Sequence, residues 1–486
     1  MWSRLIAVLA SFALIAAACG GGEVTSDDDD QETTTATEAP AEDEPEDEPE
    51  DEPADDEPAD EPADDEPADE PADDEPADEP ADDAPALTAS FRGVTEDTIT
   101  IGVTMLDFVD LVEKNLSPQG WGDQQLVMQT YFDNVNANGG INGRMIEPIY
   151  EFYTPLGTTV AAEVCTRLTV DNEIFAIIGG FLGPAETENV CITDTNNTVL
   201  IGGQQSEERL EQAQAPWLQT SSLRNRRLSV FVDLLEQDGR LDDARVAIIG
   251  SIELEDVFEQ AEALFQEKGV EPVLVAINDV PQGDIVAENA RWQVLAENIR
   301  ASGAEQVLVI GSGQAGARGI FENGLDVEKW FLERNAIDNP GENTTAEMLE
   351  GVITPTGLTN DEIYDEEGTQ QCREIFFAAN PDIIEDRLPS EYAEGEEQWF
   401  NPIMSYCRWI QAFTQVATAA GPDLTPETFL AAAEGLGDFK LPGLPFSSFG
   451  PGKYDADDSF RLSVFDMTIG EDGDLSPITD ILDGDL

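Results

Sequence analysis

Histidine is absent from the 486-residue chain, and basic residues are scarce, with 23 lysines and arginines against 103 acidic residues. Without an imidazole, no catalytic triad, zinc site or proton relay that depends on histidine can form. The net charge of −80 repels phosphate groups, so we expect no nucleic-acid partner. Carboxylate, thiol and lysine chemistry are the side-chain chemistries that these deficits leave open.

The sequence also lacks an apolar run long enough to cross a bilayer comfortably. The run at 5–18 follows Arg4, contains one serine as its only polar residue, and predicts a signal peptide at 1–18. It ends in IAAACG at 15–20, which resembles the lipobox of bacterial lipoproteins. The resemblance implies lipidation of Cys19, a membrane anchor and an extracytoplasmic protein. The alternative is an ordinary signal peptide with a chance cysteine.

Large apolar residues are almost missing from the next segment, 19–88. Between Glu23 and Asp83 there are 33 acids and no base, and the nonapeptide EPADDEPAD repeats at 52–60, 61–69 and 70–78. Proline blocks helix and sheet while like charges repel, so we predict a disordered, extended tether. A calcium-collecting tract is the alternative, but the EF-hand spacing and its glycine are absent.

Cysteine is rare, with five residues in the whole chain. Once Cys19 is set aside, an even number remains, which is typical of disulfides in an exported protein. Three pairings are possible. Sequence proximity and the expected packing of neighbouring βα units favour Cys165 with Cys191 and Cys372 with Cys407. A metal site is the competing interpretation, and it lacks both histidine and close CxxC spacing.

The chain after 88 alternates short apolar runs with helical stretches, which indicates α/β architecture with parallel sheets covered by helices on both faces. In such folds ligands bind at the carboxyl ends of the strands. The predicted strands are 98–104, 145–150, 175–178, 199–201, 246–249, 273–277, 307–310 and 462–468. The predicted helices are 123–138, 161–170, 187–195, 256–268, 287–302, 315–322, 362–379 and 399–420.

Several motifs resemble the type I periplasmic binding proteins, in particular the leucine/isoleucine/valine-binding group that serves ABC importers. The resemblance covers 94–467, and GGINGR has a physical basis, because its glycines can end a helix and reverse the chain tightly. The motifs are VTEDTITIGVT at 94–104, NANGGINGR at 136–144, EIFAIIGG at 173–180, ARVAIIG at 244–250 and LTPETFLAAAEGL at 424–436.

The resemblance implies two doubly wound parallel-sheet lobes, joined by a hinge of three crossings, that close around a small solute. Lobe one is expected at about 89–218 and 358–440, and lobe two at about 219–357 and 441–486. The expected partners are a small-molecule solute, an ABC permease and, through the lipid anchor, the membrane. No cofactor, metal or catalytic residue is expected.

Candidate ligand-binding residues follow from the resemblance position by position. Trp121 in GWGD stands where the family often has an aromatic wall, and Gly183 replaces a family serine while its turn can offer backbone amides to a carboxylate. In lobe two, Glu253 can pair with a ligand amine. Core, structural or solvated roles are the alternatives for these residues. The candidates are Trp121, Gly183, Gln204, Gln205, Ser206, Glu253 and Gln314, with Glu255 beside Glu253.

A GxGxxG pattern at 311–316 follows a predicted strand, with Asp326 and Glu333 downstream. This is the pattern of a dinucleotide-binding turn. Any doubly wound fold also needs small residues where a strand turns tightly into a helix, and we favour that interpretation.

Three classes of function are therefore open. The preferred class is the receptor of an ABC importer for an amino acid or a related amine or amide compound. The second is a ligand-sensing or structural lipoprotein of the same fold. The third is a hydrolase with paired carboxylates, although no GxSxG or SxxK pattern supports it.

Overall fold

The computed structural model describes residues 87–484 except 115, 116, 118, 119, 282, 283, 335, 336, 338–342, 385, 389, 390, 393–395, 471 and 472. The predicted signal peptide, Cys19 and nearly all of the predicted tether lie outside the described residues. None of the helices in the described part is both long and apolar enough to cross a membrane.

The first sheet has five parallel strands in the order β2-β1-β3-β4-β5. β3 and β4 are buried along their whole length, as their runs of isoleucine, valine and leucine predict. The chain places β2 on one side of β1 and β3 on the other, so the strand order reverses there. The strands are β1 (Thr98–Leu106), β2 (Met145–Tyr153), β3 (Ala176–Gly179), β4 (Val199–Gly202) and β5 (Trp217–Leu218).

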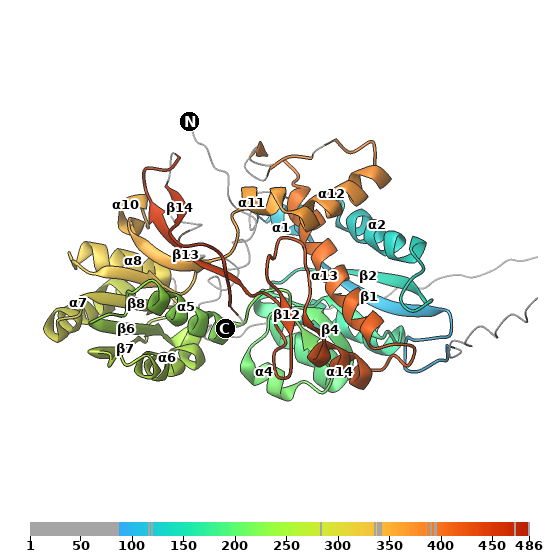
Figure 1. Cartoon of the computed structure of the whole chain (residues 1–486), viewed down its shortest axis with the longest axis horizontal. Helices are drawn as coiled ribbons and strands as arrows, with labels where there is room; N and C mark the ends of the chain where they lie inside the picture. The colour runs from blue at the N-terminus through green and yellow to red at the C-terminus, as the bar shows by residue number, and fades with distance from the viewer. Residues whose placement is uncertain are drawn as a thin grey trace, which may run out of the picture. The chain divides into compact units, whose positions relative to one another are not determined.

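Helices from two distant parts of the chain cover this first sheet. α13 contacts α2, β3 and β4, while α3 contacts β2, so early and late segments share one core. Figure 1 shows α13 beside the early strands, with the late helices α12 and α14 against α13. The helical segments are α1 (Phe108–Glu113), α2 (Gln124–Ala137), α3 (Thr158–Thr166), η2 (Arg167–Asp171), η3 (Gly183–Glu188), η4 (Cys191–Thr195), α4 (Glu207–Gln212), α11 (Asn360–Asp365), α12 (Glu367–Ala379), α13 (Phe400–Ala419) and α14 (Pro426–Leu436).

The second sheet runs β7-β6-β8-β9-β10 in parallel and continues with antiparallel β13 and β14, while β15 pairs with β13. Successive side chains point to opposite faces of a strand. In β6, Val246 and Ile248 accordingly join one apolar core, and Ala247 and Ile249 join the other. The strands are β6 (Val246–Ser251), β7 (Leu274–Asn278), β8 (Gln306–Ile310), β9 (Glu328–Phe331), β10 (Val352–Thr356), β13 (Ser459–Asp466), β14 (Asp474–Pro477) and β15 (Leu482–Asp483).

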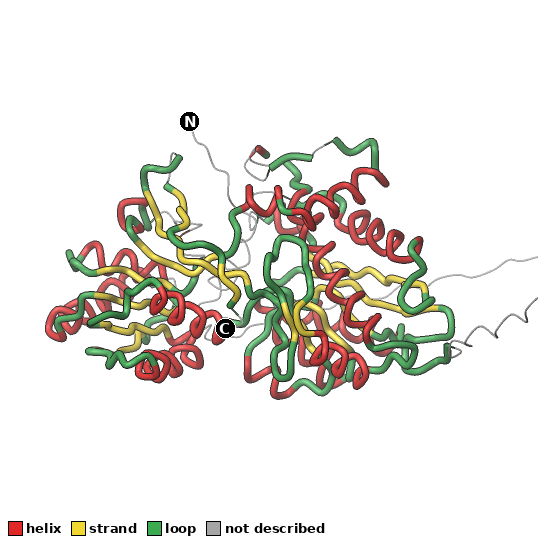
Figure 2. The backbone as a smooth tube through the Cα atoms, in the orientation of Figure 1, coloured by secondary structure: helices red, strands yellow, loops and turns green. Residues whose placement is uncertain are grey.

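Two sets of helices cover the second sheet. α5 (Arg224–Gln237) and α6 (Glu255–Glu267) pack on each other, with α5 on β10 and β13 and α6 on β6. α7 (Ile285–Ser302) packs on β7 and on α8 (Gly313–Glu322), and α8 also contacts α10 (Ala346–Leu349). Figure 2 shows strands running between helices in this part of the chain.

The doubly wound, largely parallel architecture confirms the predicted fold class, with some corrections. The predicted last strand is β13, and it runs antiparallel to β10. The predicted helix 362–379 is two helices, α11 and α12, because Glu366 takes an extended conformation and caps α12 by accepting hydrogen bonds from the Gly368 and Thr369 amides. The predicted ranges did not include α1, α4, α5, α10, α14, β5, β9, β10, β14 or β15.

Buried Arg144 explains part of the GGINGR motif. Its guanidinium donates to the carbonyl oxygens of Thr95, Thr88 and Pro422, at 2.6, 2.8 and 2.8 Å. Gly140 has a φ of 67°, and a Cβ there would meet the Arg144 carbonyl oxygen at 2.0 Å. The tight turn therefore places an arginine that joins three separate segments of lobe one.

Two disulfides lie in the first core. Cys165 is bonded to Cys191, and Cys372 is bonded to Cys407, the pairing that the sequence favours. The second bond joins α12 to α13, so it fastens α12 to a helix that packs on β3 and β4.

Three crossings connect the sheets, at 219–223, 357–359 and 450–458. The third follows a small two-stranded sheet of β11 (Gly437–Asp438) and β12 (Ser448–Phe449). Leu441, Phe449 and Ala456 belong to the core of the first sheet, whereas Phe460 belongs to a core of the second. The expected end of lobe one was 440; we propose that the boundary lies between 456 and 460 instead.

Candidate functional site

Each sheet reverses its strand order at one point, and the predicted site residues lie at the carboxyl ends of strands around these two points. In the first sheet the reversal falls between β1 and β3, and in the second between β6 and β8. A crevice forms outside the strand ends at such a point, because the connecting segments leave to opposite faces of the sheet. The structure therefore provides one candidate half-site on each lobe.

Paired glycines shape the lobe-one edge. Gly179 and Gly180 end β3, Gly202 and Gly203 end β4, and a Cβ on Gly180 would meet the Cα of Gly203 at 2.7 Å. Buried Asn189 holds the loop after β3 by accepting from the Phe181 amide at 2.7 Å and donating to the Phe181 carbonyl at 2.8 Å. This edge is close-packed.

The lobe-one candidates differ in their surroundings. Gln205 is buried, its Nε2 donates to the Trp217 carbonyl at 2.7 Å, and its Oε1 is buried without a hydrogen-bond partner among the described residues. Ser206 accepts from the Arg209 amide at 3.4 Å and begins α4. Gln204 is half-buried, and its backbone N–H donates to the carbonyl oxygen of Phe181.

Gly183 begins the short 3₁₀ segment η3 with a φ of 58°, after β3. This position is at the same strand edge as Gln205 and Ser206. A glycine is suited to the positive φ, so the backbone conformation alone accounts for the residue type.

Trp121 lies in the aromatic core of lobe one rather than in an open surface. Its ring stacks on Phe108 with centroids 5.0 Å apart and meets Tyr406 edge-on at 5.8 Å. Trp121 is 9% exposed. The tryptophan thus supports the loop after β1, and only a small part of it is open to a ligand.

In lobe two, Glu253 and Gln314 follow β6 and β8. Glu253 is exposed, and its carboxylate accepts a hydrogen bond from the Ser251 hydroxyl. Gln314 is half-buried in the first turn of α8. Glu255 is exposed at the start of α6. Glu253 and Gln314 therefore both lie beside the point where the strand order of the second sheet reverses.

The glycines of the GxGxxG pattern serve packing. A Cβ on Gly311 would meet Ser251 Cβ at 2.8 Å, and one on Gly316 would meet Val309 at 3.0 Å. Gly319, one turn further along α8, lies against Trp292 of α7, where a Cβ would be 2.3 Å from the ring. The small residues let α8 approach β8 and α7 closely.

Ser312 and Glu333 form a polar corner beside this turn. Ser312 is 6% exposed with a φ of 47°, and its hydroxyl has no hydrogen-bond partner among the described residues. Glu333 accepts from the Gly311 amide at 2.7 Å through Oε2, while its buried Oε1 has no such partner. Burial raises the pKa of the Glu333 carboxyl, against the opposing charges of Arg224 and Arg227.

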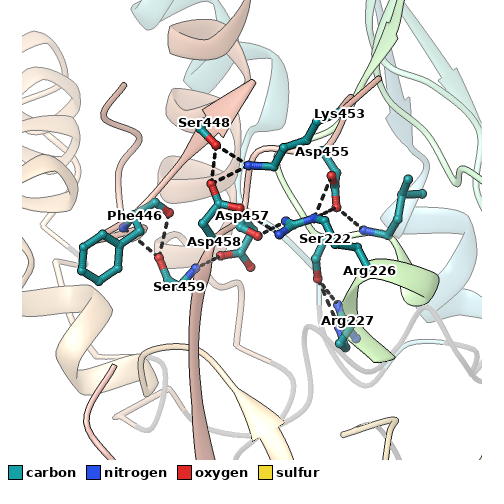
Figure 3. Close-up of polar contacts among 11 residues, drawn as sticks. Ser222, Arg226, Arg227, Phe446, Ser448, Lys453, Asp455, Asp457, Asp458 and Ser459 are labelled. Atoms are coloured by element: carbon teal, nitrogen blue, oxygen red, sulfur yellow. Dashed lines mark hydrogen bonds and ion pairs between the residues drawn. The ribbon is translucent and has the colours of Figure 1, made fainter. Parts of the chain in front are cut away.

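A charged network fastens the first crossing to the third (Figure 3). Asp455 accepts from the Leu223 amide at 2.6 Å and pairs with Arg226 at 2.8 Å. Arg226 also pairs with Asp458 at 2.8 Å, and Lys453 approaches the same carboxylate at 2.7 Å. Burial lowers the pKa of Arg226, but the surrounding carboxylates outweigh it and the net shift is upward. The network fixes two of the three chain crossings together.

The sequence analysis missed this arginine cluster. RNRR at 224–227 is a dense basic run in an acidic chain, and that contrast is the signal that could have found it. It also missed Ser312, whose burial and unusual backbone conformation depend on the packing of Gly311 against Ser251.

The candidate site consists of polar groups at the two strand edges. In the described part of the chain, no group of three or more cysteines or acids is placed to hold a metal ion. The polar groups at both strand edges are backbone amides, side-chain hydroxyls, side-chain amides and charged side chains. Such groups are suited to holding a small polar solute. Fold and site together define a two-lobed solute receptor with a hinge.

The comparisons agree. The family model described as periplasmic binding protein matches residues 122–462. The chain belongs to this family of extracytoplasmic substrate-binding proteins. No curated protein matches the chain in sequence.

Solved structures show the same fold at low sequence identity. An ABC transporter substrate-binding protein from Desulfitobacterium hafniense in complex with Leu has a TM-score of 0.53 and 13% identity, covering 79% of this chain and 100% of that one. A solute-binding protein of an ABC transporter from Rhodopseudomonas palustris BisB5 in complex with 3,4-dihydroxy benzoic acid has a TM-score of 0.51 and 13% identity. The match covers 80% of this chain and 98% of that one. A leucine-, isoleucine-, valine-, threonine- and alanine-binding protein from Brucella ovis, in its closed conformation, has a TM-score of 0.52 and 14% identity. The match covers 80% of this chain and 96% of that one.

Proposed function

We propose that the protein is the receptor of an ABC importer and delivers a small polar solute to a permease at the cell membrane. The observation that carries this proposal is the matched pair of polar strand edges, one on each sheet, connected by three crossings. Two lobes that can move about a few connecting strands enclose a ligand by closing on it. Binding and release, without covalent chemistry, make up the proposed mechanism.

Within this proposal, Gln205 and Ser206 contact the solute from lobe one, with Gln204 and the amides near Gly183 beside them. The buried Oε1 of Gln205 supports its part, since a buried oxygen without a partner gains a hydrogen bond when a ligand donor reaches it. From lobe two, Gln314 and Glu253 face the solute. Trp121 contributes the small exposed part of its ring.

The solute class that we propose is an amino acid or a related small amine, amide or acid. The relatives of the same fold are described in complex with leucine and with 3,4-dihydroxy benzoic acid, so both aliphatic and aromatic carboxylates belong in a first search. A mixed lining of amide, hydroxyl and charged groups is compatible with solutes of this size and polarity.

We further propose that Cys19 is lipidated after removal of residues 1–18, and that the acidic repeats form a spacer between membrane and receptor. The lipobox sequence and the proline-rich, uniformly acidic composition support these assignments. An extended spacer of this type reaches up to about 3.1 Å per residue. It would let the receptor capture solute away from the surface and return to a permease.

A thermal-shift screen of the purified chain tests the receptor function. A solute that binds the folded state alone raises the melting temperature by mass action, by an amount that grows with its concentration. The panel comprises amino acids, aromatic acids, amides, polyamines, short peptides and sugars. Gln205→Ala should weaken the shift, while Gln266→Ala, an exposed residue of α6, should not. Absence of a shift across the panel in folded protein would count against the proposal.

A further inference from the structure

The first observation concerns the distribution of positive charge between the two strand edges. On lobe one, Arg209 forms an ion pair with Glu186 at 2.7 Å. At the hinge, Arg226 at the start of lobe two forms an ion pair with Asp455 at 2.8 Å. On lobe two, exposed Arg224 makes no hydrogen bond or ion pair among the described residues, and its charge acts on Glu333. Available cationic charge is therefore placed at the lobe-two edge.

A second arginine reinforces this edge. Arg227 donates to the Ser222 hydroxyl through Nε at 3.2 Å and Nη2 at 3.1 Å. Its charge also acts on Glu333, the residue that binds the Gly311 amide. Cations at the start of a helix are electrostatically unfavourable, because the helix dipole is positive there. Three arginines lie in the first turn of α5. Arg226 is paired with Asp455 and Asp458, and the charges of Asp457, Glu333 and Asp455 act on Arg227. Exposed Arg224 is therefore the arginine of this turn whose charge is available to an added anion.

The third observation is the start of α8. This helix of 10 residues begins immediately after Ser312, and no side chain caps it, so amides of its first turn are open to an acceptor. Ser312 adds a hydroxyl, 94% buried and without a partner in the described structure, at the same turn. Helix amides with an adjacent hydroxyl donor form an anion-binding arrangement.

From these observations we infer that lobe two, not lobe one, receives the carboxylate of the solute, at the first turn of α8 with Ser312 as donor and Arg224 as the countercharge. The inference rests on the proposed receptor function and deepens it. It reverses the expectation that the amides near Gly183 hold a carboxylate. Glu253 at the neighbouring strand end is then positioned for a positively charged part of the same solute.

The test compares acids with their own amides. Calorimetric titration of the full chain at constant ionic strength uses 4-hydroxybenzoate against 4-hydroxybenzamide, and L-leucine against L-leucinamide. We expect the acid of at least one pair to bind, and its amide to bind at least ten-fold more weakly. A hydrogen bond to a charged group contributes enough to account for roughly that ratio or more.

Variants then locate the carboxylate. Arg224→Gln changes an exposed residue and should leave folding intact while weakening acid binding by about ten-fold; Ser312→Ala should weaken it several-fold. Arg245→Gln is the matched control, because Arg245 is exposed just before β6 at the opposite edge of the same sheet. The control should bind as the natural chain does.

The outcomes separate the two proposals. If Arg224→Gln and Ser312→Ala bind the acid as tightly as the Arg245→Gln control does, the lobe-two carboxylate site is overturned. The receptor function would still stand. Equal binding of acid and amide would also overturn this site and leave the receptor function standing. Binding by no member of either pair, nor by any solute of the thermal-shift panel, would overturn the receptor function itself.

Discussion

Arg226, in the first turn of α5, pairs with Asp455 on the third crossing at 2.8 Å, although the two residues are 229 positions apart. Asp455 is 1% exposed, and it also accepts from the Leu223 amide. One buried carboxylate therefore connects both chain crossings and the helix that opens lobe two. The hinge is a defined polar structure rather than a set of loose linkers.

Replacing one partner of this pair should be costly. Asp455→Asn leaves the Arg226 charge buried with weaker compensation, so we expect a loss of about 3 kcal/mol in the free energy of unfolding. Urea denaturation followed by fluorescence measures it. Lys114→Gln, which breaks an exposed pair with Asp110, is the control and should change stability by less than about 0.5 kcal/mol. Equal effects of both variants would contradict the structural role of the hinge pair.

The disulfide between α12 and α13 should stabilise lobe one. Cys372 and Cys407 are separated by 35 positions, and opening a loop of this length frees chain entropy in the unfolded state. We expect the double change Cys372→Ser and Cys407→Ser to cost about 3 to 4 kcal/mol. Thermal unfolding of this variant beside the natural chain provides the measurement, with mass spectrometry of the intact protein to verify both bonds. An unchanged melting temperature would show that the bond contributes nothing.

Acid sensitivity should include a contribution from Glu362. Hydrogen bonds from Arg461 hold the pKa of the Glu362 carboxyl at about 2, below its ordinary value of 4.5. A depressed pKa stabilises the folded state above the unfolded pKa, and this contribution disappears as the pH falls from about 4.5 through about 2. Because Glu362 is 43% exposed, we expect only about 1 kcal/mol.

Glu362→Gln measures that contribution. The stability difference between the natural chain and the variant should be constant above pH 5 and should shrink steadily below about pH 4.5. Glu347→Gln, an exposed acid in α10, is the control. A difference that does not change with pH would contradict the assigned pKa.

The anchor is tested at Cys19. Cys19→Ser should abolish incorporation of a labelled fatty acid and move the protein from the membrane fraction to the soluble fraction, because a cysteine thiol is the lipid acceptor in the proposed processing. Cys372→Ser with Cys407→Ser, which leaves Cys19 in place, is the control. Membrane retention of the Cys19 variant would contradict the anchor.

Much of the fold was predictable because local and long-range signals agree. The helix predicted at 123–138 is α2, with Asp123 accepting from the Leu126 amide at its start and Gly139 at a φ of 99° after its end. α5 was missed because its RNRR start opposes the helix dipole, so its stability depends on apolar packing and on Asp455. β5 was missed because it has only two residues, and β9 because it begins with charged Glu328 and Lys329 and so lacks the apolar run that marks β3 and β4.

The site was harder to predict than the fold. The resemblance placed the candidate residues after strands, and the structure places them at the carboxyl ends of strands, a position that follows from strand order. The resemblance did not indicate how exposed each candidate side chain is. Gln205 has a buried side-chain oxygen, whereas Glu253 is exposed. Nor did the resemblance give the contacts between distant loops that bring Glu333 to Gly311. Such relationships depend on packing in three dimensions, which a single sequence does not show.

Closure of the two lobes around a solute can be measured as a distance. Spin labels at Asp171→Cys in lobe one and Glu297→Cys in lobe two, both exposed positions, report the distance between lobes by double electron–electron resonance. With a solute that raises the melting temperature, the account predicts a shift of the distance distribution to one shorter, narrower population. A distribution that saturating solute leaves unchanged would contradict a receptor that works by hinge closure.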